Sequence, residues 1–132
     1  MLRRDLITAE MQKLAQVLAR IMGLKLEGNL EEAEELFKES LLKEFEISED
    51  ELLTDSNNEF NTLLNSKEFP AEKLEMLSQF LYADLTPSRQ QERNKLVADK
   101  LLLIYQMLEE KHHIVSMVNL DRQKKIQQYL NP

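Results

Sequence analysis

The sequence predicts an all-α protein, a single domain of six to seven helices spanning residues 1–132. Gly occurs only twice and Pro only three times, so few positions break a helix or favour a tight β-turn. Leu is abundant, and the Glu, Lys, Gln and Ala residues beside it are good helix formers. Apolar residues recur three and four positions apart, which is the spacing of one face of an α-helix. A hydrophobic content of 42% is enough for a packed core in 132 residues.

The first predicted helix covers residues 2–26. Gly28 is its predicted stop signal, because Gly adopts the left-handed conformation beyond a helix end without a steric penalty. The apolar stripe of this helix has spacings of four, three, four and three residues and consists of Ile7, Met11, Leu14, Leu18 and Ile21.

A second helix is predicted to fold back on the first, so that the two form a helical hairpin. Asn29 suits its N-cap, since an Asn side chain can accept a hydrogen bond from the free amides of the first turn. Glu31 and Glu32 lie in that turn, where the helix dipole favours negative charge. The predicted buried face consists of Ala33, Leu36, Phe37, Ser40 and Leu41, with Phe45 as a further candidate.

Residues 17–45 resemble one tetratricopeptide repeat. Ala33 and Phe37 match the Ala and the aromatic residue that lie four positions apart in the second helix of that family. The Gly28-Asn29 turn lies where the repeat has Gly before Asp or Asn. The resemblance covers about one repeat of roughly 34 residues, and it implies helical hairpins stacked in tetratricopeptide style. It gives Gly28, Asn29, Ala33 and Phe37 an architectural role in the hairpin.

The whole chain is also similar to a group of uncharacterised bacterial all-helical proteins that contain a tetratricopeptide-like hairpin. The similarity rests on residues 1–37, on the segment FPAEKLEMLSQFLY at 69–82 and on NLDRQKKI at 119–126. It implies the fold and supplies no chemistry.

Residues 1–45 are thus predicted to form the long helix and the hairpin, and residues 46–69 to form short, irregular helices. Ser48 and Glu51 have the spacing of a capping box, which starts a short helix ending near Leu53 or Thr54. A further short helix should follow, with Phe60, Leu63 and Leu64 facing inward.

Residues 70–132 are predicted to form a second helical hairpin and a C-terminal helix. Pro70 suits the first position of one helix, and Thr86 followed by Pro87 suits the start of the next, which ends near Lys111. A tight connection at 114–118 should precede a last helix at 120–130, capped by Asn119. The inward positions of the hairpin are Leu74, Leu77, Leu81 and Leu85 on one helix and Val97, Leu101, Ile104 and Leu108 on the other.

The charge of the chain restricts its partners. The net charge is −7, and residues 27–60 contain 13 acidic residues against two basic ones, whereas residues 111–132 carry a net charge of +3. Phosphate recognition depends on clustered Lys and Arg, so we expect no nucleic-acid partner.

The cellular location of the protein is predicted from its cysteine content and its apolar runs. The chain has no cysteine, Asp5 and Glu10 interrupt the apolar run that a signal peptide needs, and the longest apolar run, 101–105, is too short to cross a bilayer. We therefore expect a cytoplasmic protein with no membrane partner.

The sequence predicts no catalytic residue, metal site or cofactor. Glu109 and His112 have an E-x-x-H spacing, but a di-iron site needs a second such pair, and His113 is the only other histidine. No glycine-rich phosphate loop or nucleophile elbow is present. The amphipathic Tyr82, Tyr105 and Tyr129 suit either a groove or the boundary of a core.

The first function hypothesis is a non-enzymatic protein-interaction or adaptor module. It would use either a groove between the hairpin and its neighbours or the acidic face of the second helix. The candidate interaction face is formed by Glu31, Glu32, Glu35 and Glu39, which would attract a basic partner or else serve only as a solvated helix face. One alternative is a small-molecule-binding or enzymatic protein with a pocket between helices. Another is a structural protein that self-associates.

Overall fold

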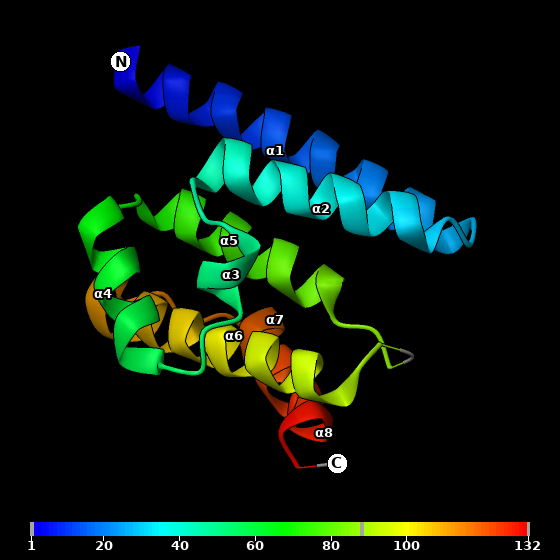
Figure 1. The fold of residues 1–132 in the computed structure, drawn as a ribbon. Helices are drawn as coiled ribbons and strands as arrows, with labels where there is room; N and C mark the ends of the chain where they lie inside the picture. Colours follow the sequence, from blue (N-terminus) through cyan, green and yellow to red (C-terminus); the bar gives the residue numbers. More distant parts are fainter. Residues whose placement is uncertain (1, 88, 132) are drawn as a thin grey trace. The chain divides into compact units, whose positions relative to one another are not determined.

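Figure 1 shows the fold in a computed structural model, which describes residues 2–87 and 89–131. Over these ranges the protein is all-α, as predicted, and contains no strand. Only Ile126 separates α7 from α8, and counting these two as one helix gives seven, the upper end of the predicted number. The helices are α1 (Leu2–Leu26), α2 (Leu30–Phe45), α3 (Glu49–Leu52), α4 (Asn57–Lys67), α5 (Ala71–Asp84), α6 (Gln91–His112), α7 (Met117–Lys125) and α8 (Gln127–Leu130).

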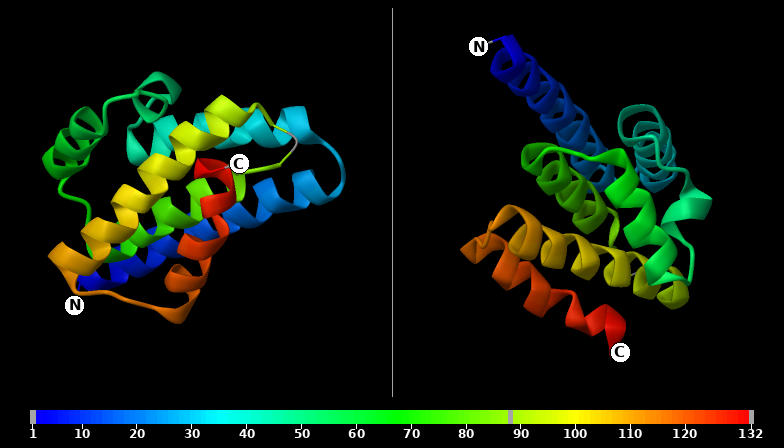
Figure 2. Two further views of the ribbon diagram at one scale, coloured as in Figure 1. Left: turned by 90° about the horizontal axis from the view of Figure 1, so that it is seen from below. Right: turned by 90° about the vertical axis from the view of Figure 1, so that its left-hand side faces the viewer.

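The chain divides into two compact units, Met1–Glu49 and Asp50–Pro132, and each is described by itself. The first unit is the predicted hairpin, in which α1 and α2 pack against each other (Figure 2). Ala33 and Phe37 are buried on α2, as the hairpin resemblance implies. On α1 the buried part of the predicted stripe consists of Leu14, Leu18 and Ile21.

The turn of this hairpin is closed by Gly28. Its φ of +82° confirms the predicted left-handed conformation. The amide of Gly28 donates to Lys25 O at 3.1 Å, and the amide of Asn29 donates to Leu24 O at 2.8 Å, which is the hydrogen-bond pattern of a Schellman motif. Asn29 occupies the N-cap of α2, but the predicted side-chain cap is wrong, because its Nδ2 donates to Glu27 Oε2 at 3.4 Å instead.

The second unit is built around α6. This helix contacts α4, α5, α7 and α8, and α5 lies antiparallel to it (Figures 1 and 2). A helix with neighbours on several sides needs a broad apolar face. All eight predicted inward positions of this hairpin are buried, including Leu85, which follows the last residue of α5. Within the described residues, no helix is long and apolar enough to cross a membrane.

The start of α6 differs from the prediction because of a buried ion cluster. We expected the helix to begin at Pro87, but it begins at Gln91, and Ser88 lies outside the described residues. Asp84 lies at the end of α5, and its side chain is only 2% exposed. Its two oxygens each accept a hydrogen bond, at 2.5 Å, from Arg89 Nη1 and Arg93 Nη1.

The backbone carbonyl of Thr86 also contributes to the late start of α6. Its carbonyl accepts from the amide of Arg89 at 3.0 Å and from Asn94 Nδ2 at 2.8 Å. Because these bonds fix the backbone in a turn, Thr86 does not cap a helix beginning at the next residue.

The C-terminal helix also begins earlier than predicted. Ser116 is the N-cap of α7, and its Oγ accepts from the amide of Asn119 at 3.0 Å. Asn119, the expected N-cap, is buried inside the helix. Part of the predicted 114–118 connection is therefore helical, and the predicted helix at 120–130 is interrupted at Ile126.

Among the residues that the structure describes, three helices are followed by a residue other than Gly in the left-handed region: Glu46, Glu68 and His113. This conformation costs an L-residue roughly 1–2 kcal/mol, and replacement by Gly removes that cost. Gly also increases the conformational entropy of the unfolded chain, which lowers the free energy of unfolding by about 0.4–1 kcal/mol. We therefore expect His113→Gly to raise the free energy of unfolding by about 0.5–1 kcal/mol in a urea titration. Gln106→Gly, inside α6, should lower it by about 1 kcal/mol. Equal losses from both variants would contradict this account.

Candidate protein-interaction site

A groove of about 520 Å³ lies at α3 and α4, entirely within the second unit. Its rim carries three carboxylates, those of Asp50, Glu51 and Glu59, all on exposed residues. Leu63 is half-buried and supplies accessible apolar surface, whereas Phe60 is buried and forms the base of the groove. The remaining lining residues are Thr54, Thr62 and Ser66. The volume is that of a site for a drug-sized molecule or a few peptide side chains.

The corner of the groove between α3 and α4 is held by hydroxyl groups. Ser56 is the N-cap of α4, and its Oγ accepts from the amide of Glu59 at 3.2 Å. Thr54 Oγ1 accepts from the amide of Ser56 at 3.3 Å and donates to Glu59 Oε2 at 3.1 Å. The carboxylate of Glu59 is therefore oriented before any ligand arrives, which reduces the entropy lost on binding.

Two lysines of α6 tie this corner and α4 to the centre of the unit. The Lys100 ammonium donates to the backbone carbonyl of Thr54, and it lies 6.0 Å from the centre of the Phe60 ring. Lys111 Nζ donates to Asn65 Oδ1 at 3.1 Å near the other end of α4. Both bonds join residues 46 positions apart, so they fix the groove to the helix at the middle of the fold.

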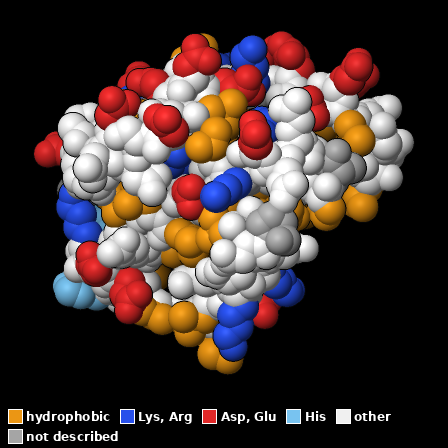
Figure 3. All heavy atoms as spheres, turned by 60° about the horizontal axis from the view of Figure 1, so that its bottom comes forward, with side chains coloured by type: hydrophobic (Ala, Val, Ile, Leu, Met, Phe, Trp, Pro, Cys, Tyr) orange, Lys and Arg blue, Asp and Glu red, His pale blue; other side chains and the backbone are white. Residues whose placement is uncertain are grey.

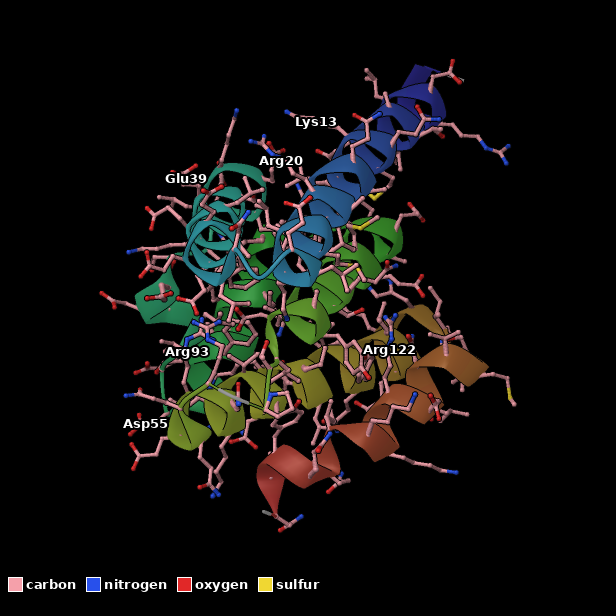
Figure 4. The ribbon with its side chains drawn as sticks, turned by 90° about the vertical axis from the view of Figure 1, so that its right-hand side faces the viewer. Lys13, Arg20, Glu39, Asp55, Arg93 and Arg122 are labelled. Atoms are coloured by element: carbon pink, nitrogen blue, oxygen red, sulfur yellow. The ribbon has the colours of Figure 1, made fainter. Side chains whose placement is uncertain are left out.

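Lys100 is the titratable group with the most unusual environment near the groove. Its residue surface is 0% exposed, and burial lowers its pKa below 10.5, against the opposing charges of Asp99 and Asp55. A lysine with a lowered pKa is a general feature of catalytic amines. Here the ammonium is covered and is engaged by Thr54, so its geometry suits support of the groove rather than attack on a ligand. Figure 4 labels Asp55.

The groove has the chemistry of a site for cations. Three carboxylates lie around an apolar surface, and hydroxyl groups offer further acceptors. A Lys or Arg side chain from a partner would place its methylene stem on Leu63 and its charge at the rim. Within the described residues, no group of three or more metal-ligating side chains of the His, Cys, Asp and Glu types is arranged to hold a metal ion.

The acidic face predicted from the sequence lies on α2, in the first unit, whereas the groove residues belong to the second unit. Glu31, Glu32, Glu35 and Glu39 are all exposed. Figure 4 shows Glu39 on α2, with Lys13 and Arg20 on α1. Lys13 Nζ contacts Glu44 Oε1 at 3.2 Å, so the described ion pair between the two helices uses a carboxylate outside the predicted face.

Tyr82 and Tyr105 lie beside Arg122 of α7, which Figure 4 labels, and Tyr129 lies near Tyr82. The Arg122 guanidinium lies 4.6 Å from the centre of the Tyr82 ring. Burial raises the pKa of Tyr105 to about 12, while the charge of Arg122 acts in the opposite direction. Burial and the neighbouring Tyr82 also raise the pKa of Tyr129. These contacts join α5, α6, α7 and α8, so the tyrosines lie at a core boundary, one of the two roles considered for them.

The other predicted features stay separate from the groove. Glu109 and His113 are exposed, and His112 is half-buried at the end of α6. The groove was not predicted from the sequence, because most of its residues lie in the 46–69 segment, for which short, irregular helices and no site were expected. A signal was nevertheless present, since Ser56 and Glu59 have the spacing of a capping box.

Comparison of the chain with protein-family models, with curated proteins and with solved structures finds no match.

Proposed function

We propose that this protein is a non-enzymatic protein-interaction module that binds a basic segment of a partner in the α3–α4 groove. The observation that carries the proposal is the groove itself, in which three carboxylates surround an apolar surface. Its fixed corner supports recognition of a peptide over a purely diffuse attraction, because Glu59 is oriented by Thr54.

The charge distribution supports the same class of partner. Residues 27–60, which include most of the groove, hold 13 acidic and two basic residues. A field of one sign increases the association rate of an oppositely charged partner and repels nucleic acid. The proposal therefore includes a basic protein partner and neither nucleic acid nor a membrane.

The proposal places the α1–α2 hairpin among tetratricopeptide-like hairpins and the protein in the bacterial cytoplasm. The left-handed Gly28 and the buried Ala33 and Phe37 support the first part. The lack of cysteine supports the second, since disulfides are favoured in oxidising compartments.

The direct test uses a fluorescent eight-residue lysine peptide as the probe. Asp50→Asn combined with Glu59→Gln removes two charges at the rim, and each exposed ion pair contributes about 0.2–1 kcal/mol. We expect the dissociation constant, measured by fluorescence anisotropy at about 0.1 M salt, to rise by about 2- to 30-fold. Higher salt should weaken binding by the wild type.

The matched control removes two equivalent charges elsewhere in the same unit. Glu72→Gln combined with Glu92→Gln changes the exposed first turns of α5 and α6. We expect this control to bind within about twofold of the wild type, because surface charges far from a site are largely screened. Equal weakening of both double variants would mean nonspecific attraction and would refute the groove as the site. Tight binding of spermine without the peptide would favour a small-molecule function instead.

A further inference from the structure

The exposed side of α2 combines acidic residues with a leucine. Glu31, Glu35 and Glu39 follow one another at intervals of four residues, and Leu42 lies three residues further on, so all four share one side of the helix. We call this set the α2 stripe. Leu42 is 58% exposed, whereas Phe37 on the opposite side of the helix is 2% exposed. Packing within the hairpin therefore does not account for a leucine at this position.

A second exposed surface has the complementary character. On α7, Met117 is 83% exposed and Leu120 is 43% exposed, and Lys124 follows at the next position of the same helix face. We call these three residues, together with Val115 and Val118, the α7 patch. Both valines are more than half exposed. In Figure 3, hydrophobic side chains at the lower edge of the view lie between the histidines and a group of Lys or Arg side chains.

The local electrostatics leave Lys124 available as the cation of this patch. The nearest acidic residue in sequence, Asp121, contacts Lys125 Nζ at 3.0 Å. The contact with Asp121 also raises the pKa of Lys125, through a hydrogen bond first and its charge second. Residues 111–132 carry a net charge of +3 within a chain whose net charge is −7.

We infer that the α7 patch of one copy of this chain docks on the α2 stripe of a second copy. The contact would bring Met117 and Leu120 against Leu42, and Lys124 against the carboxylates of the stripe. Apolar surface at the centre and opposite charges around it are the usual arrangement of a specific interface. Because the two surfaces differ, the contact is head-to-tail. The patches are small, so the association should be weak and reversible.

This inference goes beyond the proposed function and uses none of the groove residues. A head-to-tail contact leaves one unused stripe and one unused patch at the ends of every dimer. Wild-type protein should therefore form larger species as its concentration rises. Light scattering coupled to gel filtration should give masses that rise above 15.6 kDa as the loaded concentration increases.

Two single variants separate this contact from every other mode of association. Leu42→Glu destroys the stripe and keeps the patch, whereas Met117→Glu destroys the patch and keeps the stripe. Both positions are more than half exposed, so both variants should fold, as circular dichroism would verify. Each variant alone should remain at 15.6 kDa over the range in which the wild type associates.

An equimolar mixture of the two variants should form a dimer with twice the mass of one chain. The intact patch of one variant meets the intact stripe of the other, and growth stops there because no further matching surfaces are present. A wild type that stays monomeric at all concentrations would overturn the inference. So would an unchanged mass in the mixture, because it would show a symmetric contact or a different surface. Binding of the α7 patch to anionic phosphatidylserine vesicles, lost in Met117→Glu without any protein association, would identify a membrane surface as the occupant and would also overturn it.

Discussion

Replacing Asp84 with Ala is expected to lower the free energy of unfolding by about 3–5 kcal/mol, the usual cost of removing one partner from a buried ion pair. The Asp84 side chain is 2% exposed, and its two oxygens form ion pairs with Arg89 and Arg93. Both arginine side chains are also largely buried, so the substitution leaves two cations near apolar surface without this counter-charge. Urea unfolding followed by circular dichroism measures the loss.

Glu92→Ala is the matched control for Asp84→Ala. Glu92 is an exposed carboxylate in the first turn of α6, close in sequence to the same arginines. Exposed carboxylates contribute little to stability, so its replacement should change the free energy of unfolding by no more than about 0.5 kcal/mol. A loss below about 1 kcal/mol for Asp84→Ala would show that the cluster does not hold the α5–α6 connection.

The second large effect is expected at Lys100. Lys100→Ala removes buried methylene groups, at about 0.8 kcal/mol each, and leaves the Thr54 carbonyl without its buried donor, at about 1–3 kcal/mol. Release from the desolvation of the ammonium offsets part of this cost. We expect a net loss of about 2–4 kcal/mol in the free energy of unfolding.

Lys100→Met separates packing from hydrogen bonding, because Met keeps most of the side-chain volume. We expect it to cost about 1–2 kcal/mol, mainly through the Thr54 carbonyl. A variant as stable as the wild type would show that the bond to Thr54 contributes nothing to the groove.

The pH dependence of the same variant tests the charge of Lys100. Burial lowers its pKa in the folded protein, so the unfolded chain binds the proton more tightly. The free energy of unfolding should therefore rise with pH between the lowered pKa and 10.5. The raised pKa of Tyr105, about 12, acts oppositely and removes stability from pH 10 upward. Subtracting the Lys100→Met curve from the wild-type curve cancels the Tyr105 effect and leaves the Lys100 contribution.

The sequence predicts much of this fold because several of its signals are local. Gly28 needs no tertiary information to adopt a positive φ, and apolar spacing alone identifies the inward faces of α5 and α6. The helix starts at Gln91 and Met117 depend on longer-range or competing bonds, those of Asp84 with Arg93 and of Ser116 with Asn119. Two candidate N-caps close together cannot be ranked by residue type alone.

The site was harder to predict because Lys100, a charged residue that supports it, is buried. Lys100 lies three positions after Val97 and four before Ile104, on the apolar stripe, yet its residue type argues for solvent. Its position on the stripe was therefore the available signal. Its partner, Thr54, is 46 positions away, and no periodic pattern specifies such a pair. The predicted acidic face on α2 did prove exposed, but periodicity could not show that Leu42 interrupts it at the surface.

The measurement that tests the proposed groove most directly is a titration of ¹⁵N-labelled protein with the eight-residue lysine peptide, followed by amide chemical shifts. The proposal predicts saturable shifts concentrated at residues 50–66, with smaller changes at the α2 stripe. It further predicts that Asp50→Asn with Glu59→Gln moves the saturation at those residues to peptide concentrations about 2- to 30-fold higher. Shifts that are confined to α2, or that are spread evenly over every acidic surface without saturation, would contradict a specific site at α3 and α4.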